Sequence, residues 1–101
     1  MVKASFCIRE DSAGFTVKGH SGYAEEGSDI VCAAVSSAAI MSVNTITEIL
    51  AVEGTAKVDD GYLQFEVSGS KAAADIIRGL KLHLEELALQ YPEYVSVTTE
   101  V

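Results

Sequence analysis

Hydrophobic and polar residues alternate along the first part of the chain, which predicts two short strands. The apolar positions within residues 2–9 are Val2, Ala4, Phe6 and Ile8. A period of two is typical of a strand that buries one face. Residues 10–14 are acidic, small or glycine and predict a turn, and residues 15–18 then resume the alternation as a second strand.

A long apolar segment after residue 28 predicts the first helix. Ser28 and Asp29 are both good N-cap residues, and the helical pattern continues to about Val52, with Gly54 as its C-terminal cap. The stripe expected to face the core is Val31, Val35, Ala38, Ser42, Ile46 and Ile49.

The second half of the chain repeats the plan of the first. Residues 55–67 predict a hairpin around a turn at residues 59–61, because an Asp-Asp-Gly sequence separates two alternating runs. A second helix is expected from Ser70 until Pro92 stops it, and residues 94–99 alternate as a last strand. The resulting order, ββαββαβ, predicts an α+β fold with a mainly antiparallel five-stranded sheet and two helices on one face, in a single domain over residues 1–101.

Composition narrows the classes of function. Fifteen acidic and seven basic residues give a net charge of −8, which argues against direct binding of nucleic acid and suits a basic protein or peptide as partner. We expect no membrane span, since no continuous apolar run reaches the roughly 20 residues that a bilayer requires. The N-terminus lacks the apolar core of a signal peptide, so a cytoplasmic location is expected.

The chain has two cysteines and two histidines, and none of these residues indicates a functional site when it is considered singly. Neither Cys7 nor Cys32 has a second Cys or His at zinc-ligand spacing, so we expect neither a metal nor another cofactor. Cys7 is interpreted as structural. His83, in the second helix, is interpreted as solvated or packed against the sheet edge.

His20 and Cys32 form the candidate chemical pair. A cysteine in the first turn of a helix lies near free backbone N–H groups and the positive end of the helix dipole, both of which favour a thiolate. Gly22 and Gly27 allow the intervening loop to fold so that the imidazole reaches the thiol, whereas the acidic residues nearby oppose ionisation of the thiol. Spacing alone leaves two interpretations open: a thiol hydrolase, or a structural cysteine in an apolar helix.

The same segment carries a series of motif residues. They are Gly19-His20, Tyr23-Ala24, Gly27 and Asp29-Ile30-Val31-Cys32-Ala33-Ala34-Val35-Ser36. This series resembles the signature of the bacterial ribosomal-processing cysteine protease family, Prp, and length and element order are similar across essentially the whole chain. The resemblance implies a cytosolic homodimeric protease that removes a short N-terminal extension from a large-subunit ribosomal protein (bL27-type). It also implies that Cys32 is the nucleophile and His20 its partner, and it matches Ser36 and Asp29 to further positions of the motif.

Supporting roles follow for the residues around this pair. Ser36 stands four residues after Cys32, so its hydroxyl shares a helical face with the thiol. It holds the thiol or a substrate carbonyl, or it bonds a carbonyl of its own helix, and both interpretations stay open. Asp29 is interpreted as an N-cap rather than a third catalytic residue. The loop glycines, namely Gly19, Gly22 and Gly27, are candidates for letting the loop open and close over a peptide.

Two other functions compete with proteolysis. A non-catalytic ribosome-assembly factor would use the acidic surface to hold a basic ribosomal protein. A redox sensor would use an activated Cys32 that forms a sulfenic acid without cleaving peptides.

Overall fold

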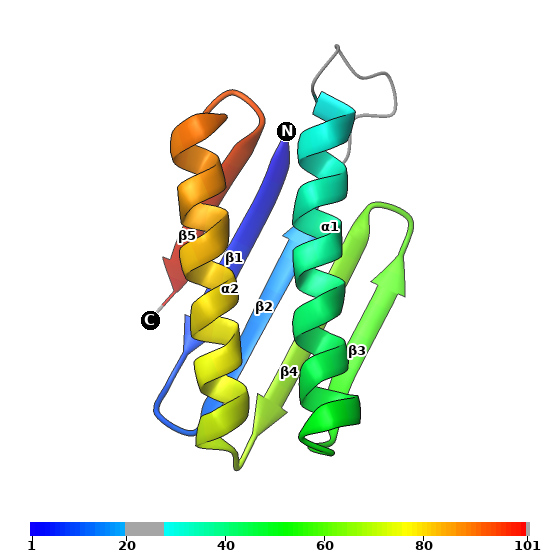
Figure 1. Cartoon of the computed structure of the whole chain (residues 1–101), viewed down its shortest axis with the longest axis vertical. Helices are drawn as coiled ribbons and strands as arrows, with labels where there is room; N and C mark the ends of the chain where they lie inside the picture. The colour runs from blue at the N-terminus through cyan, green and yellow to red at the C-terminus, as the bar shows by residue number, and fades with distance from the viewer. Residues whose placement is uncertain (20–27, 101) are drawn as a thin grey trace.

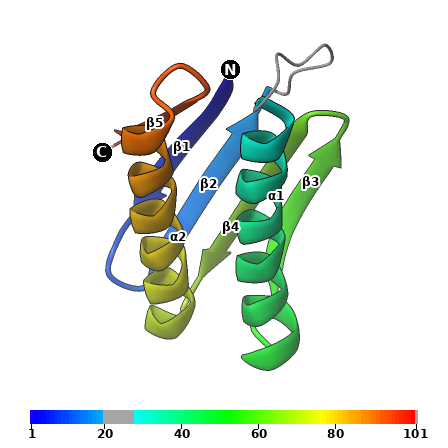
Figure 2. The same cartoon turned by 45° about the horizontal axis from the view of Figure 1, so that its top comes forward.

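The chain forms one five-stranded sheet with two helices on one face, as Figures 1 and 2 show from two directions. The structure is a computed structural model that describes residues 1–19 and 28–100, so the expectations for His20, Gly22 and Gly27 lie outside the described residues. In chain order the elements are β1 (Val2–Ile8), β2 (Ser12–Lys18), α1 (Ser28–Asn44), a π-helical turn η1 (Thr45–Ile49), β3 (Gly54–Asp59), β4 (Tyr62–Ser68), α2 (Lys71–Gln90) and β5 (Val95–Glu100).

The sheet has the strand order β3-β4-β2-β1-β5. Three neighbouring pairs are antiparallel, and β1 pairs with β5 in parallel. The predicted order of elements and the mainly antiparallel sheet are therefore confirmed. Both helices lie against the same face, and the other face of the sheet carries no helix in the described part of the chain.

The core lies between this sheet and the two helices. The alternation expected for β1 is confirmed, because its apolar side chains face the helices while its polar side chains face the open side. Phe6, Phe15 and Phe65 lie on three adjacent strands, with ring centroids 5.8 Å and 6.1 Å apart. From α2, Ile77 and Leu84 are fully buried against them, as the helical spacing predicted.

Two strand boundaries differ from the prediction. β2 begins at Ser12 rather than at residue 15, because Ser12 pairs with β4, and Ala13 and Gly14 pair with β1 on one side and with β4 on the other. Pairing on both sides outweighs the turn preference of these small residues. β5 begins one residue later than expected, at Val95, which is buried beside Val2.

The end of the first helix also differs from the prediction. The helix widens into the π-helical turn η1, in which the Leu50 N–H donates to the Thr45 carbonyl, and it stops before Val52. The extra residue in this turn rotates the following side chains, so Ile49 is exposed although the stripe placed it in the core. The left-handed backbone position after the helix belongs to Ala51, with φ 55°, and not to Gly54.

Gly54 has a different role, at the start of β3. A Cβ there would overlap the buried Phe65 ring and lie 2.9 Å from the Glu66 carbonyl oxygen. Glycine at this position therefore allows β3 to pack closely against β4.

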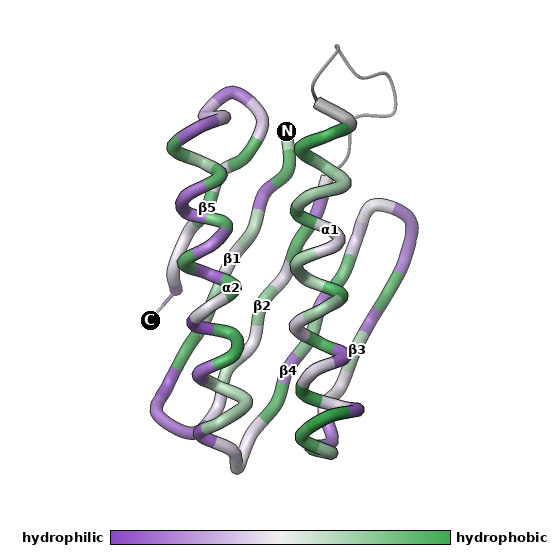
Figure 3. Tube along the Cα trace, in the orientation of Figure 1, coloured by the Kyte–Doolittle hydropathy of each residue, from purple (hydrophilic) through white to green (hydrophobic). Residues whose placement is uncertain are grey.

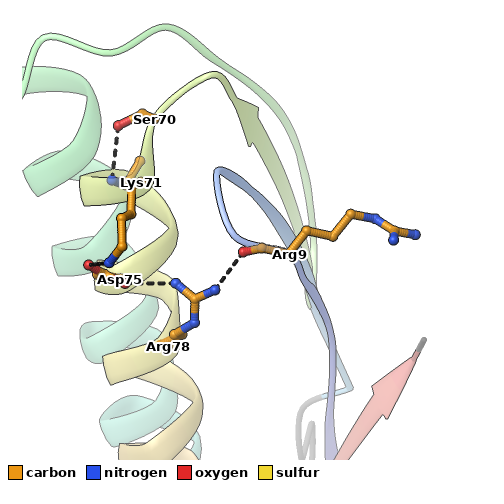
Figure 4. A network of polar contacts seen from close by, with 6 residues as sticks. Arg9, Ser70, Lys71, Asp75 and Arg78 are labelled. Carbon is orange, nitrogen blue, oxygen red and sulfur yellow. Dashed lines mark hydrogen bonds and ion pairs between the residues drawn. The ribbon is translucent and has the colours of Figure 1, made fainter.

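The start of α2 is anchored to the turn between β1 and β2 (Figure 4). Ser70 is the N-cap and accepts a hydrogen bond from the Ala73 N–H, as expected for a helix opening at Gly69-Ser70. Arg78 donates to Asp75 at 2.7 Å and to the Arg9 carbonyl at 2.6 Å. The hydrogen bond from Lys71, together with that from Arg78, holds the pKa of Asp75 below its ordinary value.

The segment Ile30–Ile49 is long and apolar enough to cross a membrane by length and composition, with a mean hydropathy of 1.7. This departs from the expectation drawn from continuous apolar runs. In the structure one face of the segment packs on the sheet through fully buried residues such as Val35 and Ile46.

Gly54→Ala is expected to lower the free energy of unfolding by about 1–3 kcal/mol, because the added methyl group overpacks the Phe65 ring. Gly79→Ala is the matched control. Gly79 lies in α2 with open space around its Cα, so alanine there is expected to raise stability by about 0.5–1 kcal/mol. Urea unfolding of both variants checks the pair, and equal effects of the two substitutions would contradict the close approach at Gly54.

Candidate active site

Cys32 lies one turn inside α1. The helix begins at Ser28, so Asp29 is within its first turn and Cys32 is the fifth helical residue. The helix thus begins two residues earlier than a cap at Asp29 implied, and Cys32 lies at the start of its second turn rather than in the first. Side chains on a helix lean toward its N-terminus, so a side chain at this position leans toward the first turn.

A groove beside Cys32 separates α1 from the β3–β4 hairpin. It has a volume of about 340 Å³ and opens to solvent. Its lining residues are Val17, Gly19, Cys32, Ser36, Ala39, Ile40, Val58, Asp59, Asp60, Gly61, Tyr62 and Leu63. Cys32 is partly buried, and it packs against the core while remaining accessible from this groove. The thiol is therefore placed where an extended peptide can reach it.

The wall opposite the thiol comes from the β3–β4 hairpin. Val58 and Leu63 are cross-strand partners and give this wall an apolar surface. Asp59 and Asp60 stand at the hairpin turn, where the Asp60 N–H donates to the Asp59 carboxylate at 2.7 Å. The groove thus combines apolar walls with negative charge at one end.

Gly19 connects the end of β2 to this groove. Its N–H donates to the Gly61 carbonyl at 2.9 Å, which ties the end of β2 to the hairpin turn. Its φ of 92° lies in the left-handed region, and a Cβ would clash with the Met1 carbonyl. Only glycine fits this position without strain. The structure therefore brings Gly19 and Cys32 to one groove, while His20, the next residue in sequence, is outside the described residues.

Ser36 lines the same groove as Cys32, as the spacing of four residues predicted. Other hydroxyls of this segment donate to the carbonyl four residues earlier, for example Ser42 to Ala38 and Thr45 to Met41. In the described part of the chain, Ser36 Oγ forms no such bond. Its hydroxyl is thus available to a ligand in the groove, which favours the first of its two interpretations.

The remaining candidate residues lie elsewhere. Cys7 is a free, partly exposed thiol on the open face of the sheet and does not line the groove beside Cys32. His83 is exposed on α2, which agrees with a solvated histidine. Within residues 1–19 and 28–100, no three His, Cys, Asp or Glu side chains lie together in a way that could hold a metal ion.

Local sequence does not indicate that the β3–β4 hairpin forms part of the site. Val58, Asp59 and Tyr62 were assigned to an ordinary hairpin, and nothing local indicates that this hairpin faces Cys32. One signal was present: Val58 is a large apolar residue beside a polar turn, and it remains 76% exposed in the folded chain.

Comparison with known proteins identifies the family. The sequence model described as "Cysteine protease Prp" matches residues 1–96. The ribosomal processing cysteine protease Prp of Bacillus subtilis (strain 168) is 30% identical to this chain over an alignment of 111 residues. The alignment covers 100% of this chain and 99% of that protein.

Solved structures agree with this sequence match. A Streptococcus mutans protein superposes with a TM-score of 0.83 at 29% identity, covering 98% of this chain and 93% of its own. The essential ribosomal processing protease Prp of S. aureus, in complex with a substrate peptide, shares the fold with a TM-score of 0.86 at 20% identity, covering 99% and 100% of the two chains. The family match covers nearly the whole chain. This chain, with its groove beside Cys32, therefore belongs to the cysteine protease Prp family.

Proposed function

We propose that this chain is an endopeptidase that removes the short N-terminal extension of a large-subunit ribosomal protein (bL27-type), with Cys32 as nucleophile and His20 as its acid–base partner. The observation that carries the proposal is the position of Cys32 in an open groove of a cysteine protease family member. The relative from B. subtilis is named for ribosomal processing. A solved S. aureus relative is described with a covalently linked product peptide.

The proposed reaction uses the residues at the start of α1. His20 takes the proton of the thiol, and Cys32 Sγ attacks the scissile carbonyl carbon to form a carbon–sulfur bond. The N–H groups of the first turn, which have no partner within the helix, stabilise the oxyanion. His20 then gives its proton to the leaving amine as the carbon–nitrogen bond breaks. Water hydrolyses the thioester, which releases the carboxylate product and restores the thiol.

Shape and charge of the groove support this substrate. Ile40, Val58 and Leu63 offer an apolar surface to bulky residues beside the scissile bond. The carboxylates of Asp59 and Asp60, and the net charge of −8, attract a basic ribosomal protein. As further parts of the proposal, the enzyme acts in the cytoplasm, as a homodimer, and without a cofactor.

Cys32→Ala is expected to lower the rate of cleavage of a precursor with the N-terminal extension by at least about 10³-fold, because the nucleophile is lost. Cys7→Ala is the matched control, since Cys7 lies on the open face of the sheet and away from the groove. Mass spectrometry of the ribosomal protein before and after incubation measures both rates.

Three outcomes of this experiment would contradict the proposal. Cleavage that survives in Cys32→Ala would remove Cys32 as the nucleophile. Tight binding of the precursor by the wild type without turnover would favour the non-catalytic assembly factor. Rapid formation of a sulfenic acid at Cys32 without proteolysis would favour the redox sensor.

Gly19→Ala is expected to lower the free energy of unfolding by about 1–3 kcal/mol and to reduce kcat/KM by about tenfold or more. The reason is that alanine strains the left-handed backbone and contacts the Met1 carbonyl, which displaces the segment that leads to His20. Gly69→Ala is the control, because Gly69 has φ 75° but open space around it and lies far along the chain from the groove. If Gly69→Ala reduced kcat/KM as much as Gly19→Ala, the effect would be general and the role of Gly19 at the groove would be refuted.

A further inference from the structure

Asp60 is an exposed acidic residue in the turn of the β3–β4 hairpin. It lines the same groove as Cys32 and Gly19. Figure 3 shows this hairpin turn as hydrophilic, whereas α1 is apolar along most of its length. Figures 1 and 2 place the turn at the end of the sheet where β2 ends and α1 begins. Asp60 therefore brings a negative charge to the groove that contains the thiol.

The backbone places Asp60 opposite the residue that follows Gly19. β2 and β4 pair in antiparallel register as far as Lys18. The hydrogen bond from the Gly19 N–H to the Gly61 carbonyl, 2.9 Å long, extends this register by one position. The next position opposite Asp60 is residue 20, whose Cα is one peptide unit, about 3.8 Å, from that of Gly19. That residue is His20, so the sequence and the register together bring an imidazole to the neighbourhood of a carboxylate.

Gly19 also changes the direction in which the chain leaves β2. Side chains alternate between the two faces of a strand, so a regular continuation would turn residue 20 to the open face of the sheet, as for Lys18. The φ of 92° at Gly19 breaks this alternation, at a position that already lines the groove. A side chain on the following residue can therefore be directed toward Asp60 and Cys32 instead of away from them.

A carboxylate can serve an imidazole–thiol pair in two ways. A hydrogen bond from one ring nitrogen to the carboxylate fixes the tautomer and turns the other ring nitrogen toward the group on which it acts. The carboxylate also favours the imidazolium form, which in turn favours the thiolate. A negative charge that acts through the imidazole thus promotes ionisation of the thiol, whereas the same charge acting directly on the thiol opposes it.

The neighbouring Asp59 has a different role in the same turn. Its carboxylate accepts a hydrogen bond from the Asp60 N–H at 2.7 Å, so it holds the shape of the turn. The titratable residues that line the groove are Cys32, Asp59, Asp60 and Tyr62, and the Tyr62 hydroxyl donates to Gln64 at 3.1 Å. Of the two carboxylates in the groove, Asp60 is thus the one that the register places opposite residue 20.

We propose that Asp60 is a positioning residue for the cleavage reaction. Its carboxylate accepts a hydrogen bond from one ring nitrogen of His20 and directs the other ring nitrogen toward Cys32 Sγ. This inference rests on the proposed function, in which His20 is the acid–base partner of Cys32, and it adds a third side chain to that pair. The proton moves only between the thiol, the imidazole and the leaving amine, and the carboxylate stays ionised throughout.

Asp60→Asn is expected to lower kcat for the precursor by about tenfold or more and to move the alkaline limb of the kcat/KM profile lower by about one pH unit. Asparagine keeps the shape of the side chain but carries no charge, so the imidazolium loses its partner and gives up its proton at a lower pH. Asp59→Asn is the matched control, because it removes the same charge from the same turn and keeps an oxygen that accepts the Asp60 N–H. It is expected to raise KM for a basic substrate and to leave the alkaline limb in place.

NMR titration of the imidazole rings tests the same contact without any cleavage. The chain has two histidines, and His83, exposed on α2, serves as the internal reference. The titration uses the Cys32→Ala background, which removes the thiol from the coupled pair. In this background, Asp60→Asn is expected to move the midpoint of the His20 titration lower by about one pH unit, and Asp59→Asn to move it by about 0.3 unit or less. Thermal unfolding establishes that all variants are folded.

Three results would overturn the inference. Asp60→Asn that moves neither the alkaline limb nor the His20 midpoint would remove the contact, and equal shifts in Asp59→Asn would indicate a general effect of charge. A rise in KM with unchanged kcat would indicate that Asp60 binds a basic part of the substrate instead. The proposed function fails separately: a chain that does not cleave the precursor, but in which Asp60→Asn still moves the His20 midpoint, contradicts the protease and leaves the pairing of Asp60 with His20 standing.

Discussion

Burial of one stripe of the first helix against the sheet determines where everything else in the site lies. Val31, Val35 and Ile46 are almost completely buried, and each contributes about 1.5–3 kcal/mol through the removal of its side chain from water. With these residues fixed, Cys32 and Ser36 can only face the side of α1 toward the β3–β4 hairpin. The reactive group is thus positioned by packing on its own helix, and the acidic hairpin turn is brought to it by the pairing of β4 with β2.

Two glycines set the close approaches on which the groove depends. Gly54 brings β3 against β4, so that the hairpin forms a compact wall. Gly19 ends β2 in a backbone conformation that other residues avoid and ties that end to the hairpin turn. A larger residue at either position would move one side of the groove.

Periodicity in the sequence was sufficient for the order of elements and for most of the core. The alternation in β1 and the helical spacing in α2 were each interpreted correctly, because one face of each element is buried against the core. Boundaries were missed where contacts distant in sequence decide the structure: Ala13 and Gly14 look like part of a turn until strands pair with them on both sides. The π-helical turn was also missed, since no local pattern marks the extra residue that turns Ile49 outward.

For the site, the motif and the spacing of Cys32 and Ser36 were enough to place both residues on one face of a helix. The facing wall could not be found in this way, because it is formed by residues 58–63, which meet the helix only in the folded chain. The helix start was placed two residues too late, since Ser28 already belongs to the helix, so Cys32 lies in the second turn and not in the first.

The parallel pairing of β1 with β5 has a consequence for how the molecule is made. Residues 2–7 take their partners from residues 95–100, so one edge of β1 stays unpaired until residues 95–100 have been synthesised. Contacts between such distant segments are costly in chain entropy and slow folding. The five-stranded sheet becomes complete only when these two distant segments meet.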